Sequence, residues 1–203
     1  MGRRSDHSRE ELYELALATA RRIVAKDGLP GLTARKVAGA MGYAPGTLYN
    51  LFGNLDDMIV HLNARTLDDL NDRLSMNLGA GSPEEILGRM LSGYLDFLEE
   101  NSNLWNLLFE HKLPGDKKVP DWYAGKVDKV LSLVEKVLSP LFAEDRQGQK
   151  RDAACILWAS LHGICSLYQT GKLDALTSTS VREMAEALLS NFIAGLRFNQ
   201  ASD

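Results

Sequence analysis

The chain has 203 residues, of which 45% are hydrophobic and 25% are charged, and its formal net charge is −4 at pH 7. This composition is that of a globular protein long enough to bury a substantial core, and it excludes an intrinsically disordered chain. No apolar run reaches the roughly 18 residues that span a bilayer, and the first thirty residues lack a signal-peptide pattern, so we expect a cytoplasmic protein with no membrane partner.

The charge is unevenly distributed along the chain. Residues 1–55 carry eight Lys or Arg against five Asp or Glu, whereas residues 56–203 carry fifteen against twenty-two. Phosphate attraction acts locally, so a basic amino end on an acidic body is compatible with nucleic-acid binding. A charged surface that only contacts solvent can have the same composition. The charge distribution alone therefore does not distinguish it from a nucleic-acid-binding surface, and the motifs along the chain are needed.

Residues 32–52, LTARKVAGAMGYAPGTLYNLF, form the most informative segment. Thr33 suits a helix N-cap, Gly42 suits the left-handed end of that helix, and Pro45 suits the first turn of a second helix. Gly53 closes the second helix. Two short helices joined by such a tight turn are typical of a helix-turn-helix, whose second helix fits the major groove of DNA.

The two short helices have distinct inner and outer faces. Helical spacing directs four apolar residues inward: Val37, Ala38, Met41 and Leu48. It leaves four polar residues outside: Arg35, Thr47, Tyr49 and Asn50. An ordinary helical hairpin has such faces too, but here a helix predicted over residues 8–26 precedes the pair. A long helix capped by Asn54 follows it, with carboxylates in its first turn.

The remainder of the sequence is helical by its apolar periodicity, with no strand-like alternation and no internal repeat. Further helices are predicted over residues 54–78, 84–100, 104–111, 121–142, 147–170 and 181–198. We expect a bend near Pro140, because proline removes a backbone donor. The sequence therefore predicts an all-α protein of about nine helices, with an N-terminal helix-turn-helix domain (1–53), a connecting helix (54–78) and a C-terminal helical domain (79–203).

A helix, a helix-turn-helix and then a long helix together resemble the N-terminal DNA-binding domain of the TetR family of transcriptional regulators. The resemblance covers residues 8 to about 60 and rests on Thr33, Arg35, Val37, Ala38, Gly42, Gly46, Thr47, Leu48, Tyr49 and Phe52. It implies a homodimeric bacterial regulator that binds a double-stranded DNA operator. It further implies a repressor released by a small, mostly apolar effector, with no enzymatic activity, cofactor or metal, although the family includes a few activators.

The resemblance also assigns roles at DNA. Arg35 stands where the family often reaches a base edge, whereas Thr33 and Tyr49 stand where it holds phosphates. The full set of expected DNA-binding residues is Thr33, Arg35, Lys36, Tyr43, Pro45, Gly46, Thr47, Tyr49 and Asn50. Further candidates for contacts to the DNA backbone or minor groove are Arg3, Arg4 and Arg9.

Three departures from the family's pattern reduce the expected affinity for DNA. Ala44 replaces a serine-like cap before the recognition helix, Leu51 replaces a polar or aromatic residue, and Leu55 replaces a lysine that often grips phosphate. Lys36, where the family often has an acid, partly compensates for these losses.

The C-terminal domain of such proteins encloses an effector pocket. The residues expected to line it are Tyr94, Phe97, Trp105, Phe109, Trp122, Trp158 and His162, with Tyr123, His111 and Met90 as further candidates. Trp158, His162 and Gly163 resemble the WHG-type subgroup of the family. Core packing is the more common reason for such side chains, because aromatic stripes at helical spacing usually belong to the core.

The last two helices carry apolar faces wide enough to need two neighbours, and one neighbour can be a second subunit. The expected dimer interface comprises Leu157, Leu161, Leu188, Phe192 and Leu196. Paired recognition helices would then sit roughly 34–36 Å apart, as successive major-groove turns require. Burial inside a single chain is the alternative.

Two other classes of function stay open. An enzyme would use His162 with Cys165, three residues apart on one helical face, as a base and a thiol nucleophile. It lacks an orienting carboxylate nearby in sequence and a phosphate-binding loop. An adaptor that has lost DNA binding would explain why Leu55 stands where the family has a lysine.

Overall fold

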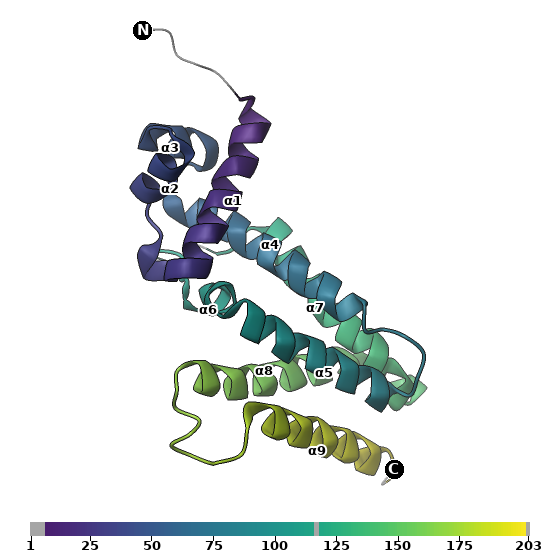
Figure 1. The fold of residues 1–203 in the computed structure, drawn as a ribbon. Coiled ribbons are helices and arrows are strands. Elements are labelled where there is room, and N and C mark those ends of the chain that lie inside the picture. The colour runs from purple at the N-terminus through teal and green to yellow at the C-terminus, as the bar shows by residue number, and fades with distance from the viewer. Residues whose placement is uncertain (1–6, 116–117, 202–203) are drawn as a thin grey trace, which may run out of the picture. The chain divides into compact units, whose positions relative to one another are not determined.

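The structure is a computed structural model that describes residues 7–115 and 118–201 (Figure 1). Within these residues it contains nine α-helices and no β-strand, which confirms the all-α prediction. The helices are α1 Arg9–Asp27, α2 Ala34–Met41, α3 Pro45–Phe52, α4 Leu55–Ser75, α5 Pro83–Glu100, α6 Ser102–Glu110, α7 Asp121–Leu138, α8 Lys150–Gln169 and α9 Val181–Ala201. Short 3₁₀ turns cover Leu29–Gly31, Ser139–Leu141 and Glu144–Gln149.

The chain divides into two compact units. Unit 1 holds the chain up to Asp68 together with Asn101–Ala124, and unit 2 holds Asp69–Glu100 together with the chain from Gly125 onward. The boundaries fall inside α4 and α7 and between α5 and α6, so α6 belongs to the same unit as the helix-turn-helix. The predicted domains, 1–53, 54–78 and 79–203, cut the chain differently and stay a prediction.

Unit 1 is built around one apolar cluster to which α1, α2, α3, α4 and α6 all contribute. Its most deeply buried members, all exposed by 1% or less, are Ala16, Leu17, Ala20, Val24, Val37, Ala38, Met58, Leu62 and Leu107. Burying a large apolar side chain contributes about 1.5–3 kcal/mol. Because α2 and α3 are only eight residues long, they depend on this burial more than on their own helix propensity.

The turn between α2 and α3 is fixed by Gly42, whose φ of 79° and ψ of 22° lie in the left-handed region. The amide of Gly42 donates to the carbonyl of Gly39 at 3.1 Å, and the amide of Tyr43 donates to the carbonyl of Ala38 at 2.9 Å. These paired bonds form a Schellman motif, which satisfies the last carbonyls of α2. The predicted end of the first short helix is therefore confirmed.

Side-chain caps mark the starts of three helices in unit 1, α1, α2 and α4. Thr33 Oγ1 accepts the amide of Lys36 at 3.1 Å, as predicted for the N-cap of α2. Asn54 Oδ1 accepts the amide of Asp57 at 2.8 Å at the start of α4. At the start of α1 the hydroxyl of Ser8 and the carboxylate of Glu11 form a capping box.

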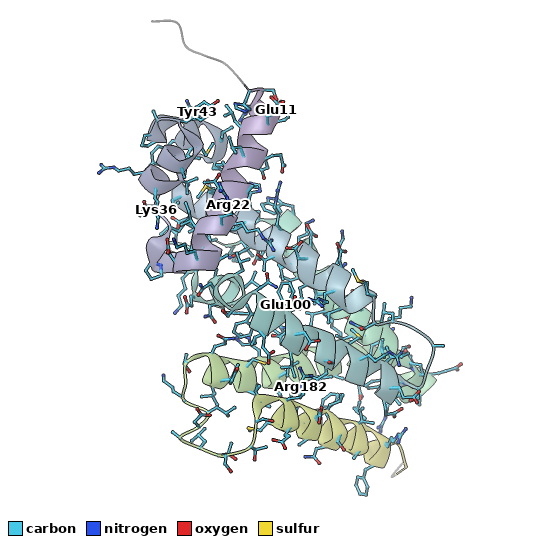
Figure 2. All side chains as sticks on the ribbon, viewed as in Figure 1. Glu11, Arg22, Lys36, Tyr43, Glu100 and Arg182 are labelled. Carbon is cyan, nitrogen blue, oxygen red and sulfur yellow. The ribbon has the colours of Figure 1, made fainter. Side chains whose placement is uncertain are left out.

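Unit 2 packs α9 against both α5 and α8. The guanidinium of Arg182, near the start of α9, donates to Asp96 Oδ1 at 2.8 Å and to Ser92 Oγ at 3.1 Å on α5; Arg182 is labelled in Figure 2. A second capping box, between Ser82 and Glu85, starts α5 where the sequence predicts it. These polar contacts fix the two helices at the rim of an apolar interior.

The helix predicted over residues 121–142 is shorter in the structure. α7 ends at Leu138 and a 3₁₀ turn follows, because Pro140 has no backbone N–H to continue the α-helical hydrogen bonds. The helix predicted from Gln147 begins only at Lys150. The side-chain amide of Gln147 instead donates to the carbonyls of Ser139 and Phe142, at 3.3 and 2.9 Å, and so stabilises the 3₁₀ segment.

Three further features bear on the kind of protein. Among the described residues no helix is both long and apolar enough to cross a membrane. Those residues also bring no group of three or more His, Cys, Asp or Glu together as a set of metal ligands. Cys155 and Cys165 both lie on α8 as free thiols.

Substitution of two glycines that lie three residues apart tests the role of the Gly42 turn. Gly42→Ala is expected to lower the free energy of unfolding by about 1–2 kcal/mol, the cost of a side chain in the left-handed region. Gly39→Ala, inside α2, is expected to raise it by about 0.5–1 kcal/mol. A Cβ at either position meets nothing within 4 Å, so collision cannot cause the difference. Urea unfolding followed by circular dichroism measures both, and equal shifts would contradict the account.

Candidate functional site

The outer side of α2, the turn and α3 carries the nine residues expected to contact DNA, a set called here the recognition face. Thr33, Arg35, Lys36, Pro45, Gly46, Tyr49 and Asn50 are exposed, and Tyr43 and Thr47 are half-buried. Tyr49 has 51% of its surface exposed. Lys36 and Tyr43 are labelled in Figure 2. The face therefore presents cations, hydroxyls and an amide, which are the groups that contact phosphates and base edges.

The cation of Lys36 has an acidic neighbour within unit 1. Its ammonium group forms an ion pair with the carboxylate of Asp27, the last residue of α1, and this hydrogen bond lowers the pKa of Asp27. The 3₁₀ turn passes so close that a Cβ on Gly31 would lie 2.3 Å from the Cβ of Asp27. Glycine at position 31 thus lets the turn pass beside Asp27, whose exposed carboxylate pairs with the Lys36 cation.

The start of α3 lacks a side-chain cap, as the alanine at position 44 predicts. Pro45 occupies the first helical position and has no N–H, and the amide of Thr47 donates to the carbonyl of Ala44 at 3.0 Å. No side-chain oxygen from residue 44 therefore shields the positive end of this helix, where an anion is favoured. Because Pro45 has no N–H and the amide of Thr47 is already bonded, Gly46 is the residue of this first turn whose amide a phosphate would meet.

Within the described part of the amino-terminal segment, His7 contacts the recognition face. His7 Nδ1 lies 2.7 Å from the hydroxyl of Tyr43, and both groups are near the surface. Arg9 is exposed at the start of α1. Arg3 and Arg4, the other predicted backbone contacts, lie outside the described residues.

Unit 2 contains an apolar cavity of about 60 Å³, called here the unit 2 cavity. It is lined by Leu74, Leu87, Met90, Leu91, Tyr94, Val130, Leu131, Val134, Leu157, Trp158, Leu161, Ala185, Leu188 and Leu189. One water molecule needs roughly 10–15 Å³, so the cavity has room for only a few water molecules. The walls suit a hydrocarbon group and offer few hydrogen-bonding atoms.

The structure separates the residues predicted to line an effector pocket. Tyr94 and Trp158 line the unit 2 cavity, and the ring of His162 stacks on Trp158 with centroids 5.7 Å apart. Phe97 is buried on α5 and does not contribute to that wall. The other three predicted residues belong to unit 1, namely Trp105, Phe109 and Trp122.

Unit 1 uses those three aromatic residues in one tilted pair and one stacked pair. Trp105 packs against Phe109 with centroids 4.8 Å apart, and Trp122 stacks on His61 at 4.7 Å with ring planes 16° apart. His61 also lies 2.9 Å from the hydroxyl of Tyr13, and burial lowers its pKa. An aromatic chain thus joins α1, α4 and the start of α7.

Unit 1 also contains a larger cavity, called here the Asn63 cavity, with a volume of about 340 Å³. It is lined by Val60, Asn63, Leu108, His111, Lys112, Leu113, Val119 and Tyr123. A second hollow of about 420 Å³ shares Val60 and Leu113 with it and is lined in part by His61, Lys118 and Trp122. Asn63 was not among the site residues predicted from the sequence. Its position beside Met58, Ile59 and Leu62 on an apolar stripe of α4 does indicate a buried amide.

The residues predicted at a dimer interface are partly buried against other helices of their own chain. Leu157, Leu161 and Leu188 line the unit 2 cavity, whereas Phe192 and Leu196 are half-buried on α9. Their role between subunits stays a prediction. A different set of exposed small and apolar residues lies on the same two helices: Ile156, Ala159, Ser160 and Gly163 on α8, and Ala194, Gly195 and Phe198 on α9.

The thiol that an enzyme would need is unsuited to nucleophilic attack. Cys165 is fully buried, and burial raises its pKa to about 12. The thiolate is the reactive form of cysteine, so this side chain stays protonated at physiological pH. The proposed partner base, His162, stacks on Trp158, and burial lowers its pKa.

Comparison with known proteins agrees with the arrangement of these helices. An uncharacterized HTH-type transcriptional regulator of Mycobacterium tuberculosis is 26% identical over 175 residues, covering 86% of this chain and 76% of the relative. A TetR-like transcriptional regulator from Rhodococcus sp. RHA1 superposes with a TM-score of 0.62 at 19% identity, over 94% of this chain and 98% of that one. The fatty acid degradation regulator FadR from Bacillus halodurans gives 0.64 at 19% identity, over 91% and 96%.

The two structural similarities, at such low identity, establish the fold alone. The family is established by sequence, since the family model described as the tetracyclin repressor-like C-terminal domain matches residues 87–192, more than half of the chain. That segment lies outside the helix-turn-helix, so the two ends of the chain point independently to one family. This protein therefore belongs to the tetracyclin repressor-like, or TetR, family.

Proposed function

We propose that this protein is a homodimeric, sequence-specific DNA-binding regulator, and specifically a repressor released from its operator by a small, mostly apolar effector. The observation that carries the proposal is the recognition face. All nine of its residues lie on the solvent side of α2, the turn and α3, and none of them is buried in unit 1. A helical hairpin used only for packing has no need of this concentration of polar side chains.

Within the proposal, the residues of the recognition face divide into two kinds of contact. Arg35 and Asn50 are exposed side chains able to form paired hydrogen bonds, so they read base edges, guanine for arginine and adenine for asparagine. Tyr49 and the uncapped start of α3 hold phosphates, which fixes the register of the helix without reading sequence. Lys36 adds a further phosphate contact when it leaves Asp27.

The effector is proposed to bind in the unit 2 cavity. The walls are almost wholly apolar, and the present volume of about 60 Å³ is too small for most metabolites. Binding therefore requires side chains of α5, α8 or α9 to move, which is how a ligand can favour one of two conformations. The relative FadR is by its name a regulator of fatty acid degradation, and an acyl chain would suit such walls.

The dimer is proposed to form through the exposed residues of α8 and α9. On α8 they recur at positions 156, 159, 160 and 163, which is one helical face. A Cβ at Gly163 would meet no described atom within 4 Å, so within the described part of the chain no helix uses the close approach that glycine permits there. Ile156, with 57% of its surface exposed, lies on the same face. We also propose that Trp158, His162 and Gly163 place the C-terminal domain in the WHG-type subgroup of the family.

Affinity for DNA tests the recognition face directly. Arg35→Ala is expected to weaken binding to the DNA flanking the protein's own gene by about 5- to 150-fold, the loss of about 1–3 kcal/mol of base contact. Tyr49→Ala is expected to weaken binding to all sequences alike. Lys129→Ala, which removes one exposed cation from α7, is the control and should change little. Fluorescence anisotropy measures all three, and a wild type that prefers no sequence at low salt would contradict the proposal.

The ion pair between Lys36 and Asp27 predicts a gain of affinity. Asp27→Asn should release Lys36 for a phosphate, tightening DNA binding a few-fold at low salt and steepening the dependence of log K on log salt by about 0.9. Glu10→Gln removes the same charge elsewhere on α1 and is the matched control. If both variants tighten binding equally, net charge and not the release of Lys36 is responsible.

The size of the protein in solution tests the interface. Gly163→Trp should raise the dimer dissociation constant at least about thirtyfold, because an indole in each of two closely packed helices costs about 2 kcal/mol or more. Gly125→Trp, at an exposed and equally open position on α7, should leave the dimer intact. Sedimentation velocity distinguishes the two species. A Gly163→Trp protein that remains fully dimeric would exclude this face as the interface.

A further inference from the structure

His7 lies two residues before the start of α1 and contacts the turn between α2 and α3. Its Nδ1 lies 2.7 Å from the hydroxyl of Tyr43, and the two rings meet edge to face with centroids 6.1 Å apart. The two residues are 36 positions apart in the sequence, so the folding of unit 1 brings them together. Nothing in the helix-turn-helix pattern predicts a role for this histidine.

The backbone is fixed on both sides of this contact. On the side of α1, Ser8 follows His7 directly and forms the capping box, in which Ser8 Oγ accepts the amide of Glu11 at 3.2 Å. On the side of the turn, the amide of Tyr43 donates to the carbonyl of Ala38 in the Schellman motif. Two side chains on anchored backbones lose little further freedom when they bind a third group, which is the condition for a preorganised contact.

The hydrogen of the Tyr43 phenol has two alternative uses. When the ring of His7 is neutral and Nδ1 carries no hydrogen, Nδ1 accepts the phenol hydrogen, which is then unavailable to DNA. When the ring is protonated, both of its nitrogens are donors, so Nδ1–H donates to the Tyr43 oxygen instead. The phenol hydrogen is then free for another acceptor, and a cation lies beside it.

The acceptor that suits this arrangement is a phosphate of the DNA backbone. Tyr43 directly precedes Ala44, the N-cap of α3, so it stands at the end of the helix where the Gly46 amide would meet a phosphate. A phosphate oxygen only accepts hydrogen bonds, and its negative charge favours a neighbouring cation. A neutral base edge would gain much less from a charge on His7.

The other charged groups in the first turn of α1 do not titrate together with histidine. Glu10 and Glu11 lie in this turn, and Arg9 is exposed beside them. The amide of Ser8 donates to Glu11 Oε2 at 2.6 Å, and the hydrogen bonds with Ser8 lower the pKa of Glu11. Carboxylates titrate well below about pH 6 and arginine well above about pH 8. Among the described residues of this turn and its cap, a change of charge between these values therefore belongs to His7.

We propose that His7 is a positioning residue for Tyr43 at a backbone phosphate of DNA, and that DNA binding takes up a proton at His7. In the complex, the protonated ring donates to the oxygen of Tyr43, and the phenol hydrogen goes to the phosphate. The affinity for DNA then rises as the pH falls through the range in which histidine titrates, and it rises on every sequence alike. This inference rests on the proposed DNA binding and adds one residue and one proton to it.

Two duplexes test the inference with the full chain, namely the DNA flanking the protein's own gene and an unrelated sequence of the same length. Fluorescence anisotropy at about pH 8 and about pH 6 brackets the titration of histidine. Both duplexes should bind about fivefold more tightly at the lower pH, the value of one exposed ion pair. The slope of log K against log salt should steepen by about 0.9, as for one further phosphate contact. His7→Gln should remove both effects.

Three further variants separate the role of His7 from the total charge of the protein. His7→Gln combined with Ser132→His keeps the number of histidines, with the new one at an exposed position of α7, and should not restore the pH dependence. His7→Lys carries its charge at both pH values and should show the steep salt slope at both. Tyr43→Phe keeps the ring but lacks the hydroxyl, so the gain at low pH should fall to about twofold.

The ¹H–¹³C signals of the His7 ring report the proton directly. At about pH 7, where histidine is partly protonated, either duplex should shift them toward the protonated form. Unmoved signals, an unchanged pH dependence in His7→Gln, or an undiminished gain in Tyr43→Phe would each overturn the inference.

The unrelated duplex separates this inference from the proposed function. A wild type that binds both duplexes equally contradicts sequence-specific regulation, whereas a pH gain lost in His7→Gln on both duplexes still supports the phosphate contact. Specific binding with no gain at low pH overturns the inference alone, and binding to neither duplex overturns both.

Discussion

The left-handed backbone at Gly42 is the constraint on which the rest of the amino-terminal unit depends. Because the chain changes direction there, in a turn of three residues between Met41 and Pro45, α2 and α3 direct Val37, Ala38 and Leu48 into a single core. The same turn leaves the polar side chains of both helices outside. A residue with a Cβ would disfavour this left-handed conformation at the end of α2. The relative positions of α2 and α3 would then change, even though every side chain of the recognition face is still present.

Local signals made the ends of most helices predictable from sequence. A cap such as Thr33 or Ser82 acts through atoms three residues away, so the residues that decide it are visible together. The joining of residues 101–124 to the helix-turn-helix unit was not predictable, because contacts such as that of Asn63 with Leu107 span 44 residues. The candidate pocket residues were split for the same reason, since aromatic spacing along a helix does not reveal which unit a residue joins.

Each of the contacts available on the recognition face is individually modest. Lys36 is engaged by Asp27, α3 has no side-chain cap, and leucine stands at position 55 where the family often has a lysine. A single copy would therefore hold DNA weakly. Two linked copies convert the second contact into an intramolecular one, and the affinity of the pair can exceed that of each head by orders of magnitude. In the proposed regulator, the exposed faces of α8 and α9 thus matter to DNA affinity as much as any residue near the groove.

The small volume of the unit 2 cavity has a kinetic consequence. In the proposed regulator, a space of about 60 Å³ would admit a sizeable effector only after its walls separate, so the rate of entry would be limited by how often the helices of unit 2 move apart rather than by diffusion. If the open form is rare, the apparent affinity falls by the fraction of time it exists. Substitutions that loosen the packing of α9 on α5, far from any ligand atom, would then increase the rate at which the proposed effector enters the cavity, and so shorten the time the regulator needs to respond.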